Sequence, residues 1–561
     1  MTARPLPVNQ PGRETPWDFA FSFSPMNQPA SAFAVKTPAL PVFDARAHGA
    51  CGDGRSLDTA AINRAIEAAH AAGGGTVNFP AGTYLSFSIR LRSRVTLHLA
   101  AGATLLAAEP AAGFGEYDAA EPNEWDAYQD FGHSHWRNSL IWGEDLTDIG
   151  IHGPGRIHGL GLTRSGPGPR RAKLAGDMPM SMRGITDVAR LQADGEPGTD
   201  TDFMNGKGNK AIALKNCRNV SLRDFSVLLG GHFALLATGV DDLTIDHVNV
   251  DTNRDGFDLD SCRNVRVSHC RVNAPNDDAI VLKSSYALGA LRSTENVFIT
   301  DCDVSGYDIG TMLDGTLQRT QELAPDLDGV TGRIKIGTET NGSFKNITVT
   351  NCLFVRSRGL AIEMVDGGTI EDVTATHLTM REIVTAPIFV RLGSRGRGPN
   401  NPPVGAVRRV TISDIVVTDA DPRYASQVVG LLGYPVEDVT LSRVNIEYRG
   451  GGTLVDAAIE PPENEKAYPE PSMFGTLPVY GLFARHVRGL TVTDMKVSYA
   501  RAEQRPPVRL DDVADASFEN FQAQRAPGTP GFVLRQVTGF SVKNSPGMAD
   551  TKREQAERET V

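Results

Sequence analysis

A short phrase that recurs along the chain constrains the fold of this protein more than any other feature of its sequence. Each copy alternates apolar with polar residues, passes a polar or Cys position and alternates again, as in "CRNVSLRDFSV" from Cys217 and "CRNVRVSHCRV" from Cys262. Alternation at period two is typical of a short strand with one buried face. The phrase therefore predicts pairs of short strands at intervals along the chain.

The interval between the copies predicts the architecture. Successive copies recur most often at steps near 22 to 26 residues, and the two longest steps are about twice that; their first apolar residues are Val220, Leu243, Val265, Val297, Ile347, Val373, Val410, Val439 and Leu490. One coil of three short strands with turns has this length, and coils stack ~4.8 Å apart. We predict an all-β fold, a right-handed parallel β-helix from which long loops leave at particular turns.

The ends of this solenoid differ from its middle. The segment "SLDTAAINRAIEAAHAAGGG" predicts one helix, with Asp58 or Thr59 as N-cap and Gly73 at its end, and we expect it to cap the open apolar end of the stack. The charged tail "ADTKREQAERETV" is expected to fray or to form a surface helix. The predicted organisation is an N-terminal extension (1–40), a single β-helix domain (41–545) with long loops at about 161–210 and 317–330, and a charged C-terminal tail (546–561).

Composition excludes some classes of protein. The chain has 67 acidic against 56 basic residues and a net charge of -11, which argues against a protein that coats nucleic acid or an anionic membrane. No apolar run approaches the ~20 residues of a membrane helix. The N-terminal "MTARPLPVNQPGRETPWDFAFSF" lacks the apolar core of a secretory signal, so the sequence predicts a chain that stays in the cell unless a leader is missing. Oligomeric state is left open.

The six cysteines predict packing and no metal or redox chemistry. No C-x-x-C motif occurs, and a disulfide framework is not expected in so large a chain. Cys217, Cys262, Cys302 and Cys352 fall at equivalent positions of the repeat, where a small buried side chain fits. We expect no metal site and no cofactor.

One segment, "VDTNRDGFDLDSCRNVRVSHCRVNAPNDDAIVLKSS", carries more acid than a scaffold needs. Asp255 precedes Asp277 by 22 residues, the length of one coil, so the two are predicted to lie on the same face beside Asp278. Close like charges raise at least one pKa, so one carboxyl can hold a proton while its neighbours stay ionised. Glycoside hydrolysis needs that division between an acid and a base.

The local sequence sets a condition on this cluster. Neighbours in a straight strand face opposite ways, so Asp277 and Asp278 cooperate only if "PNDD" is a bend, for which Pro275 is suited. Asp258 and Asp260, in "DLD", are instead expected to cap a turn or to form an external calcium site.

At these residues the sequence resembles glycoside hydrolase family 28, the polygalacturonase family of pectin-cleaving β-helices. The family pattern is N-T-D, D-D about a coil later, G-H-G and then R-I-K. Here "NRDGFDLDSC" has Arg254 in place of Thr, "NDDAIVLKS" from Asn276 matches the second motif and "GRIKIG" from Gly332 matches the fourth. With "FDARAHGACGDGRSLDTAAINRAI" and "GGGTVNFPAGTYLS", the resemblance covers about residues 42–390.

The resemblance implies roles for these positions. It implies that Asp277 is the general acid. It implies that Asp255 and Asp278 together act as the base and position water for inversion. It implies that Arg333 and Lys335 hold a sugar carboxylate beside the cleavage point, as a guanidinium fork and a point charge can. Two further residues are expected next to the site as substrate-binding residues, Lys283 and His232.

The third motif departs from the family. Where the family has G-H-G, this chain has "VSGYDIGTMLDG", with Tyr307 or Asp308 at that place. The family histidine helps to orient the carboxylates or the sugar, so its absence puts ordinary polygalacturonase activity in doubt. Tyr307 and Asp308 are predicted to contact substrate, and Asp308 would bind sugar hydroxyls of a neutral or differently linked glycan. Three acids in later coils could line sugar subsites or cap turns, and turn capping is the favoured expectation: Glu339, Glu363 and Asp366.

The predicted function is an inverting glycosidase without a cofactor. Its expected partner is a pectin-like (galacturonan or rhamnogalacturonan) or related acidic polysaccharide or oligosaccharide. Two alternatives stay open. The first is a β-helix polysaccharide lyase or uronate epimerase, which would use a base at C5 and often calcium. The second is a non-catalytic glycan-binding β-helix, whose acidic site would no longer catalyse a reaction.

Overall fold

The computed structural model describes residues 41–111, 113–163, 204–326 and 328–561. Within these residues 37 strands join one sheet system, and neighbouring strands pair in parallel except at the C-terminal end. The predicted N-terminal extension (1–40) and most of the predicted loop at 161–210 lie outside the described residues.

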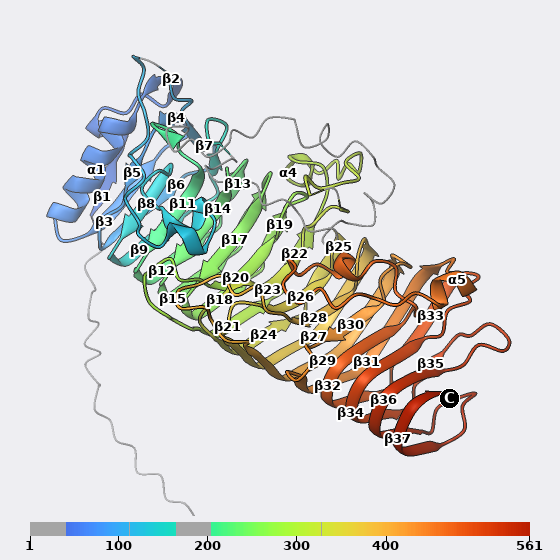
Figure 1. Cartoon of the computed structure of the whole chain (residues 1–561). Helices are drawn as coiled ribbons and strands as arrows, with labels where there is room; N and C mark the ends of the chain where they lie inside the picture. Colours follow the sequence, from blue (N-terminus) through green and yellow to red (C-terminus); the bar gives the residue numbers. More distant parts are fainter. Residues whose placement is uncertain (1–40, 112, 164–203, 327) are drawn as a thin grey trace, which may run out of the picture. The chain divides into compact units, whose positions relative to one another are not determined.

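Each coil contributes one strand to each of three stacked faces. A coil near the middle consists of β17 (Asp255–Asp260), β18 (Arg263–Ser268) and β19 (Arg271–Asn273). The coil before it pairs with all three in parallel through β14 (Phe233–Thr238), β15 (Asp241–Asp246) and β16 (Asn249–Asp251). The repeat read from the sequence is thus a parallel β-helix, and Figure 1 shows its stacked coils.

The first face carries the candidate site and is called the site face. Its strands, in stacking order, are β5 (Ile89–Arg90), β8 (Ile141–Glu144), β11 (Lys210–Lys215), β14, β17, β20 (Ile280–Ser284), β23 (Ile334–Thr340), β26 (Leu360–Met364), β28 (Ile388–Leu392), β30 (Ser426–Val429), β32 (Leu482–Thr493), β34 (Val508–Glu519) and β36 (Phe532–Lys543).

The other two faces close the coils. The second face contains β1 (Val42–Asp44), β3 (Gly75–Phe79), β6 (Val95–Leu99), β9 (Thr147–His152), β12 (Arg218–Arg223), β15, β18, β21 (Thr294–Thr300), β24 (Phe344–Thr350), β27 (Thr369–Ile383), β29 (Ala406–Ala420) and β31 (Val436–Gly450). The third contains β2 (Asp53–Leu57), β4 (Gly82–Ser86), β7 (Ala103–Ala107), β10 (Arg156–His158), β13 (Ser226–Leu228), β16, β19, β22 (Asp303–Ser305) and β25 (Leu353–Ser357), and later β33 (Lys496–Arg501) and β35 (Gln522–Ala523). The long strand β27 bends across both faces, because it pairs with β24 and with β25.

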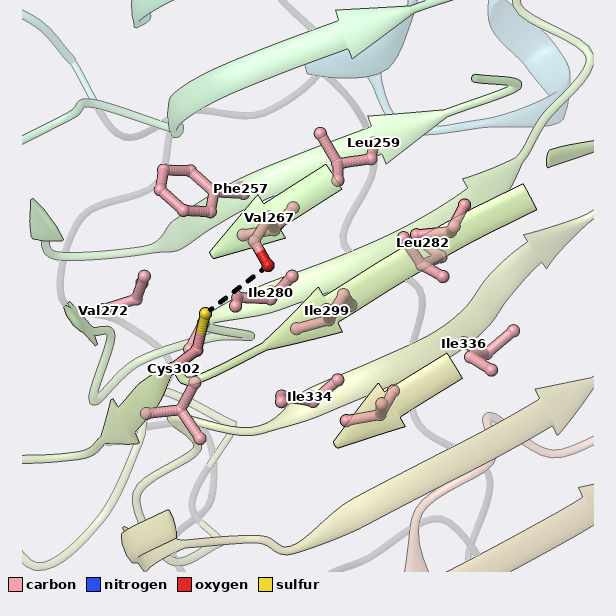
Figure 2. Packing of buried hydrophobic residues seen from close by; sticks show 14 of the residues in the cluster. Phe257, Leu259, Val267, Val272, Ile280, Leu282, Ile299, Cys302, Ile334 and Ile336 are labelled. Atoms are coloured by element: carbon pink, nitrogen blue, oxygen red, sulfur yellow. Dashed lines mark hydrogen bonds between the residues drawn. The ribbon is translucent and has the colours of Figure 1, made fainter. Parts of the chain in front are cut away.

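The core fills the inside of the coils with one row of apolar side chains per strand position. Figure 2 shows Leu259 of β17 and Leu282 of β20 in such a row, and the two residues are register partners. All six cysteines lie in the described residues and are free thiols, and five of them are buried. The Sγ of Cys302 approaches the carbonyl oxygen of Val267 at 3.9 Å inside the stack. Cysteines serve here as small buried side chains, as predicted.

The predicted capping helix is present as α1 (Thr59–Ala71), preceded by Asp58 as N-cap. Its buried face, which includes Ile62 and Ile66, joins the main core cluster. The other helical segments are short: η1 (Arg46–His48), η2 (Asp126–Tyr128), α2 (Phe131–Ser134), α4 (Thr311–Asp314), α5 (Leu454–Ala457) and η6 (Pro471–Phe474). In the part of the chain that the structure describes, no helix is long and apolar enough to cross a membrane.

The prediction for the charged tail is wrong. Residues Thr551–Thr560 form β37, which pairs antiparallel with β36, and Ala556 is buried opposite Val537. The last coil of a β-helix leaves a row of unpaired N–H and C=O groups at its edge. A reversed strand satisfies those groups, so backbone pairing outweighs the helical propensity of this charged sequence.

Candidate active site

The site face brings the three predicted aspartates together. Asp255 begins β17, and Asp277 and Asp278 lie in the bend that precedes β20. One carboxylate oxygen of each lies within 4.8 Å of the others. The one-coil spacing places the side chains on the same face, and the bend turns both neighbouring aspartates toward it.

Asp255 is the member of the cluster that favours its protonated form. Its side chain is buried, its Oδ1 has no hydrogen-bond partner among the described residues, and the Nε of Arg254 is 3.8 Å from its Oδ2. Burial, together with the nearby charge of Asp277, raises the pKa of Asp255 well above its ordinary value. Asp255 therefore retains a proton at pH values where an exposed aspartate has lost it.

Asp278 has the opposite environment. The Nε of Arg333 donates a hydrogen bond of 2.7 Å to its Oδ1, and the ammonium of Lys335 contacts its Oδ2. Burial alone would raise the pKa of Asp278, but the charges of Lys335 and Arg333 outweigh it and hold that pKa far below its ordinary value. Asp278 is thus ionised at neutral pH, close to the Asp255 carboxyl that keeps a proton.

Asp277 is the aspartate of the three that solvent reaches. Its side chain is 29 % exposed, against 4 % for Asp255 and 1 % for Asp278. Its Oδ2 accepts a hydrogen bond of 3.0 Å from the Nε of Arg254, and its Oδ1 accepts one of 3.0 Å from the backbone N–H of Asp278. A substrate oxygen can therefore approach Asp277 more readily than either neighbour.

Arg254, which stands where the resembled family has Thr, links the aspartates to His232. Its Nη1 donates to the Nδ1 of His232 at 3.0 Å. Burial and the charge of Arg254 lower the pKa of His232 well below its ordinary value, so the ring is neutral and carries its proton on Nε2. His232 lies next to the site and reaches the aspartates through Arg254, while its predicted contact with substrate stays a prediction.

Lys283 lies at the centre of a second buried network on the same face. Its Nζ is 3.0 Å from Asp258, 3.2 Å from Glu339 and 2.6 Å from the Nε2 of His133. The Lys283 pKa is raised well above its ordinary value, because the charges of Asp258 and Glu339 outweigh the effect of burial. Lys283 is therefore beside the aspartates, but its charge is already neutralised by protein carboxylates.

Several predictions of turn capping are wrong. Asp258 and Asp260 lie within β17, where they alternate with the core residues Phe257 and Leu259 and so point away from the core. Asp258 binds Lys283, whereas Asp260, the last residue of β17, does hold a turn, because its carboxylate accepts hydrogen bonds from the backbone and hydroxyl of Ser285 just after β20.

Two of the three later acids also lie in strands. Glu339 lies in β23 and Glu363 in β26, both buried on the site face. Asp366 does hold a turn, because its carboxylate accepts from the backbone N–H of Arg397 at 2.8 Å and binds the guanidinium of Arg395. Position relative to the strand ends separates the correct prediction from the two wrong ones.

Arg333 directly precedes β23 and Lys335 is its second residue, so both lie on the site face. Their surroundings differ from the expectation. Nη1 and Nη2 of Arg333 donate to the two carboxylate oxygens of Glu470 at 2.9 and 2.7 Å. The Nζ of Lys335 lies 6.0 Å from the ring centre of Tyr468. Glu470 and Tyr468 come from the segment between β31 and β32, more than one hundred residues along the chain.

Tyr307 and Asp308 belong to a neighbouring loop. The carboxylate of Asp308 accepts hydrogen bonds from the backbone N–H groups of Thr320 and Gln321, at 2.9 and 2.8 Å. Tyr307 is buried, with the guanidinium of Arg319 4.9 Å from its ring centre. The side chain of Gln321 donates to Asn276, next to Asp277. Asp308 thus shapes the loop that borders the bend, and its oxygens are occupied by that loop.

Sequence reasoning did not find several residues that contact the charged side chains of the site face. They come from segments outside the repeat, and the residues are His133, Arg395, Arg397, Tyr468 and Glu470. Their segments carry no repeat phrase. The sequence signal that could have pointed to these residues is the interruption of the repeat. Such an interruption shows that a long insertion is present, but it does not show which residues the insertion contacts.

Glu363 supplies a pH-dependent prediction for the stability of this site. Both of its carboxylate oxygens are buried without a hydrogen-bond partner among the described residues, and burial raises its pKa to about 8 against the opposing charges of Arg333 and Lys335. Between the ordinary value of 4.5 and about 8, the unfolded chain has lost a proton that the folded chain keeps, so stability falls as pH rises. Glu363→Gln removes this loss, and its free energy of unfolding relative to wild type should increase by about 3 kcal/mol from pH 5.5 to pH 8.

Urea denaturation at the two pH values measures this change. Glu503→Gln is the matched control, because Glu503 is also buried; burial would raise its pKa, but hydrogen bonds from Arg505 outweigh that and lower it. Its ionisation is complete in both states above pH 5.5, so the control difference should not change with pH. A Glu363→Gln difference that is equal at both pH values would contradict the assignment of a neutral Glu363.

Two protein families match parts of the chain. Residues 192–311 match Glycosyl hydrolases family 28, and residues 42–116 match Rhamnogalacturonase A/epimerase, pectate lyase-like. The first match covers Asp255, Asp277 and Asp278.

Individual relatives agree with these matches. The exo-poly-alpha-D-galacturonosidase of Dickeya chrysanthemi is 25% identical over 394 residues, which are 65% of this chain and 59% of that protein. A stretch of 42 residues, 8% of this chain, is 67% identical to mannuronan C5-epimerase AlgE3 of Azotobacter vinelandii and covers 2% of it. The chain therefore spans less than two thirds of either relative.

A solved structure shares the fold. The hyperthermoactive exopolygalacturonase from Thermotoga maritima superposes with a TM-score of 0.55 at 15% identity, covering 93% of this chain and 96% of that one. The likeness extends over nearly the whole β-helix, which is a pectin lyase-like fold.

Proposed function

The chain belongs to glycoside hydrolase family 28, and we propose that it hydrolyses glycosidic bonds of a pectin-like polysaccharide or oligosaccharide by inversion. The observation that carries this proposal is the division of labour among three carboxylates within 4.8 Å. One buried aspartate favours its proton, one is held ionised by two cations, and the third is open to solvent.

The acid step falls to Asp277. Asp255 retains a proton, and the neighbouring Asp277, which a leaving-group oxygen can reach, receives that proton and passes it on. Arg254 holds Asp277 through Oδ2 and stabilises the carboxylate that remains after proton transfer. Protonation of the leaving oxygen breaks the glycosidic bond, which is the role of the general acid in this reaction class.

The base step falls to Asp255 and Asp278. Once the proton resides on Asp277, Asp255 is an ionised carboxylate with an unpartnered oxygen, and it can accept a proton from water. Asp278 is fixed by Arg333 and Lys335 and positions the same water. The water oxygen bonds to the anomeric carbon as the leaving group departs, so the product has the opposite anomeric configuration.

Anomeric proton NMR of the first product tests this mechanism. We expect inversion at the anomeric carbon, and product formation about 10²–10⁴-fold slower with Asp277→Asn. The carboxylate oxygens lie within 4.8 Å of one another, which is nearer to the ~5 Å of retaining enzymes than to the ~6.5–9.5 Å typical of inverting ones. The anomeric configuration of the product therefore decides between the two mechanisms. Product of retained configuration would replace water positioning by direct attack of a carboxylate on the sugar.

The alternative of a lyase or uronate epimerase draws support from the match at residues 42–116. Calcium could be held by the three aspartates, which are close enough to act as ligands. Arg254, Arg333 and Lys335 already neutralise them, however, and this favours hydrolysis. Formation of an unsaturated product that EDTA abolishes would establish the lyase instead. Equal glycan binding by wild type and Asp277→Asn, without reducing-sugar release by either, would establish a binding protein.

A further inference from the structure

The guanidinium of Arg333 is already occupied by protein carboxylates. Its Nε donates to Asp278 at 2.7 Å, and its two terminal nitrogens donate to the two oxygens of Glu470 at 2.9 and 2.7 Å. Its side chain is 1 % exposed. The two-oxygen contact with Glu470 is the geometry in which a guanidinium binds any carboxylate, including that of a uronate.

Glu470 is rigidly held at this position. It immediately precedes η6 (Pro471–Phe474), in which all four residues are buried, and Met473 and Phe474 belong to a core cluster that covers the outer side of the site face. A second buried guanidinium, Arg358, lies 3.1 Å from Glu470. The packing of η6 holds the backbone of Glu470, and Arg333 and Arg358 hold its carboxylate. Glu470 is therefore part of the site itself.

The charges around Arg333 and Lys335 balance without substrate. With Arg358, which also contacts Glu470, three cations face three carboxylates, Asp278, Glu470 and Asp326, while Glu363 is neutral below about pH 8. Lys335 is only 2 % exposed. A uronate placed here would meet the charge of Glu470 and find no unpaired cation to offset its own desolvation, which a buried charge requires.

We propose that the substrate places no carboxylate on Arg333 and Lys335, and that the sugar beside the cleaved bond is a neutral sugar. Glu470 occupies the place that the substrate carboxylate would take. This inference rests on the proposed glycosidase function and narrows its substrate class. The preferred pectic substrate is a backbone in which uronate alternates with a neutral sugar, as in rhamnogalacturonan, and the pure galacturonan is disfavoured.

The test compares oligogalacturonides with alternating rhamnogalacturonan oligosaccharides of similar length, by reducing-sugar release. Wild type should have at least about tenfold higher kcat/KM on the alternating substrate, which corresponds to ~1.4 kcal/mol of transition-state free energy. Glu470→Gln, which keeps the side-chain shape and removes the charge, should raise kcat/KM on oligogalacturonides at least about tenfold. Glu463→Gln is the matched control, because Glu463 lies in the same segment but pairs with Arg485 and His486.

The outcomes separate this inference from the proposed function. A wild-type preference for oligogalacturonides, or a folded Glu470→Gln variant without any gain on them, would overturn the inference and leave the glycosidase intact. If no pectic substrate is cleaved at all, the proposed function fails. Calorimetric titration then still decides the inference, since Glu470→Gln in an Asp277→Asn background should bind oligogalacturonide at least about tenfold more tightly than Asp277→Asn alone. Equal affinity would overturn it. The wild-type substrate ratio needs no variant, so it stands even if Glu470→Gln misfolds.

Discussion

Replacing Asp277 with asparagine should lower kcat by about 10²–10⁴-fold, the contribution that a positioned general acid makes. Asn keeps the size of the side chain and its acceptor for the N–H of Asp278. Its amide has no acidic proton that it could transfer to the leaving oxygen. Asp277 is partly exposed, so this change should leave the fold intact. Reducing-sugar release under saturating substrate measures the loss, and circular dichroism confirms the fold.

Asp303→Asn is the matched control for this experiment. Asp303 is 51 % exposed on β22, on a different face, and pairs with Arg271. Its replacement should leave kcat unchanged. If Asp277→Asn retained more than about a tenth of wild-type kcat, another group would have to protonate the leaving oxygen, and the acid role of Asp277 would be wrong.

The second large effect is on stability. Arg333→Ala should lower the free energy of unfolding by about 3–5 kcal/mol, because it removes one of the two cations that each of two buried carboxylates contacts. Arg333 donates to Asp278 and Glu470, and both of these acids are largely buried. The loss of stability should be larger above pH 5 than at pH 3, because the destabilisation comes from buried carboxylates that stay ionised without Arg333.

An exposed ion pair calibrates this measurement. Arg488 pairs with Glu437 at 3.1 Å, but the two side chains are 62 % and 36 % exposed. Arg488→Ala should therefore cost less than about 1 kcal/mol. Urea denaturation gives both values. A loss for Arg333→Ala as small as that for Arg488→Ala would mean that solvent reaches Asp278 and Glu470, and the charge balance argued for Arg333 would not hold.

The repeat made the fold predictable. Apolar residues at period two, recurring at one coil length, leave few arrangements in which every copy buries its apolar side, and the stacked coil is one that does. Asp255 and Asp277 followed from the same spacing, because residues one coil apart share a face. The bend at residues 275–278 followed from Pro275 and its polar neighbours.

The errors have a common physical origin. Asp258 and Glu363 alternate with core residues in strands, so the sequence pattern shows that they point outward, toward water in an ordinary solenoid. In this protein irregular segments cover that face, and both side chains are buried. Burial then decides their chemistry, as an ion pair for Asp258 and as a neutral acid for Glu363.

The charged tail shows the same limit in the backbone. Its sequence favours a helix, yet the unpaired edge of β36 recruits it as a strand. Local propensity is worth tenths of a kcal/mol per residue, and a tertiary edge that needs hydrogen bonds can outweigh it.

The sequence alone determined the stacked coil, the end cap and the three aspartates, because each depends on spacing along a regular repeat. Only the tertiary structure decided what surrounds them. His133 and Glu470 reach the site from segments 125 residues before Asp258 and 137 residues after Arg333. No local pattern encodes such contacts, since they arise when irregular segments fold over a face that the repeat leaves open.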